Sequence, residues 1–275
     1  MVKQAAYAVA PSRTLPSYRK PPVTEVVAGV YFDNTLPNFG VGQMGLFWHR
    51  IQKEFPRSQH AGPVAPPGSD YRWLDGVTGL PLPRIWFVSE GKNDLIQLQG
   101  DCFFFNWRKT ADGDVYPRYK YIIAGFEKQL DGFLSFLKES SFPEPKPMLC
   151  ELTYVNHVQR GAAWKTIDDI AKIFKDFCWS KDKEIFPIPK SLTWSCAIDL
   201  PDNAGAMSAT LSQVTRVGDQ NQSIRLELAC KGLGGTTSLR EMRPWFDLAH
   251  EWIVRGFSDL TTPEAQRKLW EREDV

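Results

Sequence analysis

The chain has 275 residues, of which 43% are hydrophobic and 24% are charged, and its formal net charge is +1. This composition supports a sizeable folded core and argues against long disordered regions. The near-neutral charge gives no general attraction to nucleic acid or to anionic membranes, and no apolar run approaches the length of a membrane span. The five cysteines are scattered without a C-x-x-C pair, which favours reduced thiols in a cytoplasmic protein.

The N-terminal part of the chain predicts an arm, a strand, a helix and a long loop. Residues 1–22 form an extended arm, because the Pro21-Pro22 pair at its end cannot continue a helix. The run Glu25–Phe32 predicts a strand, and apolar residues at helical spacing predict a helix over Val41–Glu54. Residues 56–84 are rich in Pro and Gly without periodicity, so we expect a functional flap or a variable insertion there.

The next segment predicts three strands followed by a long helix. Turn residues separate the strand candidates, which are Ile85–Ser89, Leu95–Gln99 and Cys102–Trp107. A continuous apolar stripe, with Pro117 in its first turn, predicts a core-facing helix that runs to Lys138. A joint between two halves of the chain then follows, marked by Pro143, Pro145 and Pro147.

The second half predicts the same order of elements. Its expected strands are Cys150–Val158, Leu192–Leu200, Met207–Val217 and Ser223–Lys231, and a helix from Thr166 to Phe177 is expected after the first of them. Ser238-Leu239-Arg240-Glu241 has the spacing of a capping box and predicts the start of a helix that reaches Leu260. Thr262-Pro263 begins a short last helix.

The two halves also match in sequence at a nearly constant offset. Glu25–Phe32 aligns with Glu151–Val158, and 117–126 aligns with 244–253, which favours duplication over chance. We predict an α+β fold with repeats at 23–142 and 148–275, each built as strand, helix, three strands and helix. Two such units most simply form one curved antiparallel sheet with the long helices on one face, as in the saddle of TATA-binding proteins or in a helix-grip fold.

No catalytic, cofactor or metal motif stands out. The four histidines have none of the spacings of metal-binding motifs, so we predict no metal site and no cofactor. Gly232–Gly235 lacks a following Lys-Ser/Thr pair, which favours a plain turn over a phosphate-binding loop. Glu25 and Glu151 occupy equivalent positions in the matched strands, and local pairing of each with an arginine is favoured over a catalytic carboxylate pair.

Three aromatic residues, Phe103, Phe105 and Trp107, share one face of their predicted strand because side chains alternate along a strand. They would serve either as a platform on which RNA or single-stranded DNA bases stack, with Arg108 and Lys109 on phosphates, or as core beneath the following helix. Aliphatic residues at the comparable strand of the second half favour the core.

Seven residues are the candidate binding residues. Five of them lie at the end of one predicted strand and the start of the long helix: Asn106, Trp107, Arg108, Tyr116 and Arg118. The other two, Arg243 and Trp245, occupy the matching stretch of the second half. Aromatic and Arg side chains dominate binding hot spots, and the alternative role of these residues is to lock strand to helix. No catalytic residue is predicted.

Several short motifs occur together along the chain. They are Pro21-Pro22 with Glu25-Val26-Val27, Asn106-Trp107-Arg108-Lys109, Tyr116-Pro117-Arg118-Tyr119, the run 151–157, and the run 253–257 with Leu260-Thr261-Thr262. As a set, over nearly the full length, they resemble a sporadically distributed, uncharacterised bacterial protein family. The resemblance implies no activity and no catalytic residues, and the family's patchy occurrence is similar to that of accessory, defence or toxin–antitoxin genes.

The leading hypothesis for function is a non-catalytic protein of the bacterial cytoplasm that binds a protein partner or itself in a regulatory or accessory role. It rests on the missing catalytic signature, the many aromatic residues and a broad sheet face. The first alternative is a small-ligand-binding or enzymatic pocket between sheet and helices, closed by the 56–84 loop. The second is RNA or single-stranded DNA binding, and no membrane association is expected.

Overall fold

Nine strands form one antiparallel sheet in the order β2-β3-β4-β5-β1-β6-β9-β8-β7. The computed structural model describes residues 14–33, 36–65, 74, 79–81, 83–161, 163–177, 179, 184–187, 189, 191–215 and 222–273. The strands are β1 (Val23–Phe32), β2 (Arg57–Ala61), β3 (Arg84–Val88), β4 (Asp94–Gln99), β5 (Cys102–Arg108), β6 (Pro147–Gln159), β7 (Thr193–Asp199), β8 (Ala206–Thr215) and β9 (Gln222–Gly232). The predicted α+β class and the single antiparallel sheet are confirmed.

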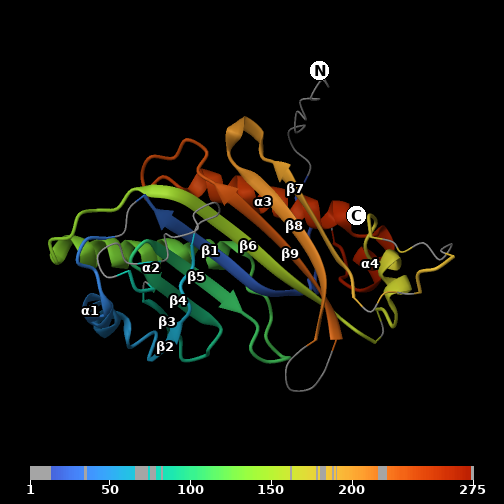
Figure 1. Cartoon of the computed structure of the whole chain (residues 1–275), viewed down its shortest axis with the longest axis horizontal. Helices are drawn as coiled ribbons and strands as arrows, with labels where there is room; N and C mark the ends of the chain where they lie inside the picture. The colour runs from blue at the N-terminus through green and yellow to red at the C-terminus, as the bar shows by residue number, and fades with distance from the viewer. Residues whose placement is uncertain are drawn as a thin grey trace.

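Two long helices lie on the same face of this sheet (Figure 1). The described helices are α1 (Val41–Ile51), α2 (Tyr119–Glu139), α3 (Arg243–Leu260) and α4 (Pro263–Lys268), with the short 3-10 helices η1 (Ile167–Lys172) and η2 (Pro201–Asn203). Helix α2 packs on β5 and β1, whereas α3 packs on β9, β6 and β8. The opposite side of the sheet is called the helix-free face below.

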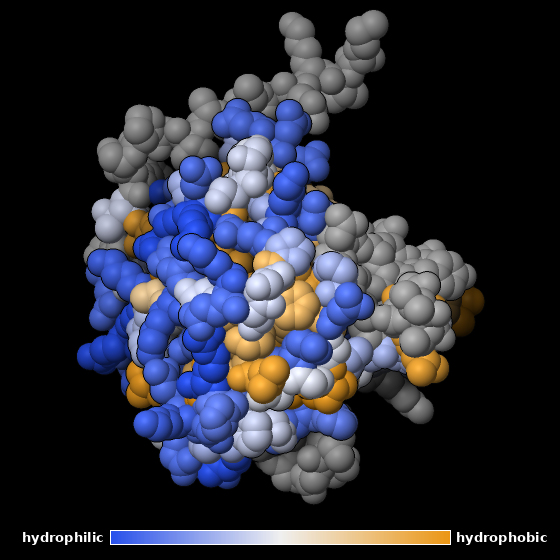
Figure 2. All heavy atoms as spheres, turned by 90° about the vertical axis from the view of Figure 1, so that its left-hand side faces the viewer, coloured by the Kyte–Doolittle hydropathy of each residue, from blue (hydrophilic) through white to orange (hydrophobic). Residues whose placement is uncertain are grey.

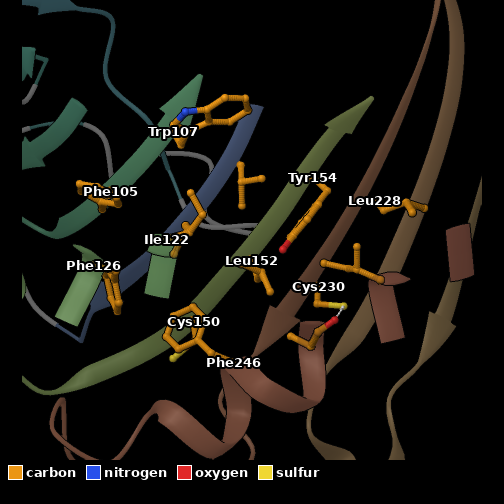
Figure 3. Close-up of a cluster of buried hydrophobic side chains, with 14 of the residues drawn as sticks. Phe105, Trp107, Ile122, Phe126, Cys150, Leu152, Tyr154, Leu228, Cys230 and Phe246 are labelled. Atoms are coloured by element: carbon orange, nitrogen blue, oxygen red, sulfur yellow. Dashed lines mark hydrogen bonds between the residues drawn. The ribbon is translucent and has the colours of Figure 1, made fainter. Parts of the chain in front are cut away.

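The main core fills the space between the sheet and the helices (Figure 3). Phe103, Phe105 and Trp107 of β5 are buried in it, as the alternation along the strand predicts. The Phe103 ring lies 6.4 Å from Phe126 and 5.4 Å from Phe133, both on α2. These aromatic side chains are therefore core and are not available to stack nucleic-acid bases.

The expectation of a loop throughout 56–84 is wrong, because β2 occupies its first part. Arg57 pairs with Val88 and Ala61 pairs with Arg84, so β2 is an edge strand. Its polar sequence is almost fully exposed and carries no hydrophobic alternation, and pairing with β3 alone selects the extended conformation. Residues 66–73, 75–78 and 82 of the expected flap lie outside the described part.

The length of one helix and the start of another also differ from prediction. The helix expected over 166–177 is the six-residue 3-10 helix η1, because Phe174 forms a β-bridge with Thr261 and so requires extended backbone. The capping box expected at Ser238 does not form. Helix α3 begins at Arg243 with Pro244 in its first turn, which fixes the start without a side-chain cap.

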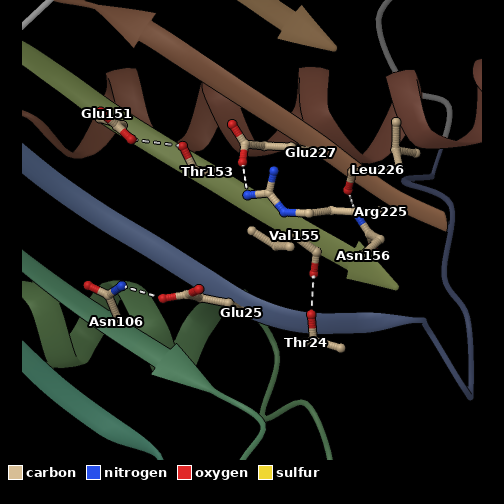
Figure 4. Close-up of polar contacts among 10 residues, drawn as sticks. All are labelled: Thr24, Glu25, Asn106, Glu151, Thr153, Val155, Asn156, Arg225, Leu226 and Glu227. Carbon is tan, nitrogen blue, oxygen red and sulfur yellow. Dashed lines mark hydrogen bonds and ion pairs between the residues drawn. The ribbon is translucent and has the colours of Figure 1, made fainter. Parts of the chain in front are cut away.

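The helix-free face carries polar contacts along its central strands (Figure 4) and a small hydrophobic cluster around Phe104. Asn106 Nδ2 donates to Glu25 at 2.7 Å, whereas Glu151 pairs with Lys231 Nζ at 2.9 Å. Glu151 lies opposite Gly29 of β1, four residues from Glu25, or about 13 Å at strand spacing. Each carboxylate is therefore satisfied locally, with an amide and a lysine in place of the predicted arginines, and the two form no catalytic pair.

The described part of the N-terminal arm, residues 14–22, lies against the C-terminal segment. Tyr18 forms a β-bridge with Arg272, and the backbone N–H groups of Arg19 and Lys20 each donate at 3.1 Å to carbonyls of residues 270–271. The Tyr18 ring meets the Phe257 ring of α3 edge-on at 5.3 Å. This pairing fixes the arm at the edge of the helix layer.

Two further observations concern the helices and the thiols of the described residues. No helix in the ranges given above is long and apolar enough to cross a bilayer. Cys102, Cys150, Cys196 and Cys230 are free thiols, and Cys178 lies outside the described residues. The end of the molecule that carries α1 is mainly hydrophilic, with a smaller hydrophobic area near its centre (Figure 2).

Candidate functional site

A cavity of about 560 Å³ opens between the helix-bearing face of the sheet, the start of α2, helix α3 and the arm. The sequence led us to expect the 56–84 loop as its cover, but no described residue of that loop lines it. The arm takes this place, with Leu15, Tyr18 and Pro22 among the lining residues. The inner wall is apolar and includes Leu228 of β9 and Phe257 of α3.

Two tyrosine hydroxyls meet inside the cavity. The oxygens of Tyr116 and Tyr154 lie 2.9 Å apart, so one hydroxyl donates to the other. Burial raises the pKa of Tyr116 to about 12 and raises that of Tyr154 well above its usual value. Both groups therefore keep their protons at neutral pH. Because the pair uses only one of its two hydrogens, the second remains for another acceptor.

A neutral histidine forms part of the same wall. The His250 ring of α3 stacks on the Tyr119 ring of α2, with centroids 4.0 Å apart and an interplanar angle of 10°. Burial lowers the pKa of His250 to about 4, although the charges of Asp247 and Glu251 act in the opposite direction. A neutral imidazole has one N–H donor and one acceptor. No described residue forms a hydrogen bond with either ring nitrogen.

Asn156 of β6 adds a third neutral polar group. Its side chain is only 3% exposed, and its Nδ2 donates to the Leu226 carbonyl at 3.2 Å (Figure 4). That bond holds the amide against β9. Within the described ranges nothing donates to the Asn156 Oδ1, so the amide can still accept a hydrogen bond from a molecule in the cavity.

Charged groups gather where α2 and α3 begin. Arg243 donates to Asp247 at 2.9 Å and to Glu127 at 3.1 Å, and Tyr119 Oη also donates to Asp247, at 2.7 Å. Arg118 donates from Nη1 to the Tyr18 carbonyl at 2.9 Å and thereby ties the arm to α2. This side of the cavity therefore combines an ion-paired network with an arginine that holds the arm.

The backbone of Arg118 is strained. Its φ of 76° and ψ of 159° lie in a region that only glycine adopts readily, at a cost on the order of 1–3 kcal/mol for other residues. Such a conformation persists only where the surroundings fix it, and here the preceding Pro117, the following helix and the arm carbonyl do so. The backbone of Arg118 is thus fixed, and the bond to the Tyr18 carbonyl restrains its guanidinium.

Three of the seven predicted binding residues line this cavity, namely Tyr116, Arg118 and Arg243. A fourth, Trp107, lies in the core directly behind them, with its ring 5.7 Å from that of Tyr116. The starts of α2 and α3 therefore both border this cavity.

The other three predicted residues lie elsewhere. Asn106 and Arg108 are on the helix-free face, where the Arg108 guanidinium lies 5.7 Å from the Trp86 ring centroid. Trp245 is buried and donates from Nε1 to the Ala204 carbonyl at 2.8 Å. These residues do not share a site with Arg118.

Sequence reasoning did not select five residues of the cavity: Tyr18, Tyr119, Tyr154, Asn156 and His250. A usable signal was present for two of them. Asn156 follows Tyr154 by two residues on a core-facing strand, and His250 stands in the apolar stripe of α3 four residues after Phe246. Polar residues at core-facing positions are uncommon without a partner or an adjoining cavity.

The residues described contain no group of three or more His, Cys, Asp or Glu side chains that would hold a metal ion. A scan against protein-family models finds no match, and a search of curated proteins finds none either. The geometry of the cavity therefore carries the functional argument alone.

Proposed function

We propose that the protein binds a small, largely apolar organic molecule in the cavity between the arm, α2, α3 and the sheet. The volume falls in the range typical of ligand sites, which are apolar hollows with a few convergent polar groups. The observation that carries the proposal is the unused hydrogen-bonding capacity of three neutral groups, the Tyr116–Tyr154 hydroxyl pair, Asn156 and His250, around one hollow. We place this binding in the regulatory or accessory role of a bacterial cytoplasmic protein that the sequence led us to expect.

Fluorescence titration with N-phenyl-naphthylamine, a neutral apolar probe that brightens in dry sites, tests this proposal. Val254 of α3 lines the cavity and is partly exposed, so Val254→Trp should place an indole ring in the cavity and obstruct it without breaking the core. The matched control is Val41→Trp at the start of α1, where Val41 is 58% exposed. We expect saturable binding that Val254→Trp abolishes and Val41→Trp leaves intact. Absence of binding, or equal binding by both variants, would contradict the proposal.

We further propose that the fold arose by duplication, with a helix-grip-like cavity at one end of the layer. The sheet order supports this, because β5 lies beside β1 as β9 lies beside β6, and β1 and β6 pair at the centre. A long helix follows β5 and another follows β9. In an experimental structure, β1, β5 and α2 should superpose on β6, β9 and α3 after a rotation near a half turn.

A second candidate function, self-association, is favoured by the edge strand β7. No described strand pairs with its outer edge, and the strand contains no Pro or Lys and no bulge, the usual protections of an edge. If a second copy pairs antiparallel about Cys196, Trp194 of each copy lies opposite Ile198 of the other. Ile198 is 45% exposed, and this register would cover it.

Light scattering and thiol cross-linking test the β7 pairing. We expect a dimer that Ile198→Lys dissociates, because a charged edge residue opposes strand pairing. The control Leu46→Lys, at an exposed leucine of α1, should leave the dimer intact. Directly opposite cysteines have Cα spacings that allow a disulfide, so mild oxidation should link Cys196 to its copy. A strict monomer at high concentration would exclude the candidate.

A further inference from the structure

We infer that the molecule bound in the cavity carries one oxyanionic group, such as a carboxylate, which lies at the cavity mouth against Arg118 and Lys120. The inference rests on the proposed function and adds the chemical class of the ligand. Three observations support it. The positive charge around the cavity is not balanced, Arg118 has N–H donors that no described residue uses, and the groups inside the cavity are neutral.

The charges that line the cavity do not cancel. Arg118, Lys120 and Arg243 are cationic, and Asp247 is the one carboxylate among the lining residues. Asp247 is already paired with Arg243, which also binds Glu127 outside the lining. No carboxylate of the described chain pairs with Arg118 or Lys120. Two cations thus remain unbalanced, and they would repel a cationic ligand that the tyrosine rings alone would favour.

Arg118 is suited to bind an oxyanion. A guanidinium has five N–H donors, and among the described residues only the Tyr18 carbonyl accepts a hydrogen bond from Arg118. Its fork matches the two oxygens of a carboxylate, and hydrogen bonds of this charged kind are the strong ones. Because the Tyr18 carbonyl already restrains the Arg118 guanidinium, part of the freedom that ligand binding would remove is lost beforehand.

The interior of the cavity places the anion at the mouth and the apolar body inside. Tyr116, Tyr154 and His250 are all neutral there, and the remaining wall includes Leu228 and Phe257. An anion among them would lose its hydration without gaining an opposite charge, which is costly. At the mouth, Arg118 and Lys120 are exposed. An anion there keeps part of its hydration and is attracted by two positive charges.

Two probes that share one aromatic body separate these contributions. Anilinonaphthalene sulfonate carries an oxyanion, whereas N-phenyl-naphthylamine has the same ring system without it. We expect the wild-type protein to bind the sulfonate roughly tenfold tighter or more, the value of one charged hydrogen bond. Arg118→Gln should remove most of this preference, and Lys138→Gln, at the far end of α2, should leave it unchanged.

Lys120→Gln provides an independent variant, because Lys120 holds no part of the arm. Arg118→Gln could loosen the arm and weaken the binding of both probes equally. In that case the Lys120→Gln variant provides the test. A reduced preference of this variant for the sulfonate, with unchanged binding of the neutral probe, supports the inference. Equal affinity of the wild-type protein for both probes, or a preference that both variants retain, would overturn it. In those cases binding of the neutral probe that Val254→Trp still abolishes would leave the proposed function standing.

Discussion

The layer between the sheet and the long helices is solid at one end and hollow at the other. At the solid end the Phe133 ring of α2 lies within 6.4 Å of the rings of four other phenylalanines, which are Phe32, Phe39, Phe47 and Phe103. At the hollow end the aromatic residues are mainly tyrosines, and Tyr18, Tyr116, Tyr119 and Tyr154 surround the cavity. The same layer therefore uses two kinds of aromatic residue for two purposes.

The difference follows from what each ring requires. Phenylalanine rings have no polar group, so close packing satisfies them completely. A buried tyrosine also needs a partner for its hydroxyl, and at the hollow end these partners are another tyrosine for Tyr116 and an aspartate for Tyr119. Hydroxyl-bearing aromatic residues at core-facing positions thus mark the end of the layer that can admit a ligand.

Phe133→Ala should have the largest effect on stability. The side chain is fully buried, and its removal leaves a cavity among rings that cannot collapse together, at a cost of about 3–5 kcal/mol. Chemical denaturation measures this loss. Binding of the neutral probe, measured per folded molecule, should stay unchanged, because the cavity lies at the other end. Loss of binding at intact folding would show that the two ends are coupled.

Acidification should destabilise the hollow end in a defined pH window. His250 has a pKa of about 4 in the folded protein, below its ordinary value of 6.5, so the unfolded chain takes up a proton at higher pH than the folded one does. The stabilising contribution is complete above pH 6.5 and is lost as the pH falls toward 4. Melting temperatures across this range should drop more steeply for the wild-type protein than for His250→Phe. If the melting temperatures of the wild-type protein and of His250→Phe fell in parallel with pH, His250 would not be the source of the acid sensitivity.

The architecture was largely predictable because it depends on periodic patterns. The strands β1, β5, β6 and β9 and the helices α2 and α3 all carry clear periods of two or 3.6. Each was expected within a few residues, apart from the start of α3. The edge strand β2 has no such pattern, and its extended conformation depends on pairing with β3. Its sequence alone therefore predicts a loop. The 3-10 helix η1 ends early because Phe174 pairs with a distant residue, Thr261.

The candidate site was predictable only in part, for a different physical reason. Arg118 and Arg243 were found because both stand at the starts of matched helices. Tyr154, Asn156 and His250 come from a central strand and the middle of a helix, where polar residues usually have structural partners. Their role emerges once the sheet order places β6 and β9 beside α3 and the arm beside both. The arm itself, with Tyr18, has no periodicity that sequence can use.

Tyr154→Phe should have an intermediate effect of about 1 kcal/mol, the net value of a typical hydrogen bond. It removes the partner of the Tyr116 hydroxyl while the ring remains. The double variant with Tyr116→Phe should cost less than the sum of the two single variants, because replacement of both partners leaves no buried hydroxyl unpaired. Strict additivity in this double-mutant cycle would show that the 2.9 Å contact contributes nothing.

Arg243→Gln should have the smallest effect on stability, below about 1 kcal/mol. The guanidinium joins α2 and α3 through Glu127 and Asp247, but the Arg243 side chain is 42% exposed, so water and salt screen the pairs. Denaturation at low and high salt should show a difference from wild type that shrinks as salt rises. Arg240→Gln, which breaks another exposed pair between an arginine and α2 at Asp131, provides the control. A loss above 2 kcal/mol for Arg243→Gln alone would mean that the hollow end depends on this network as the solid end depends on Phe133.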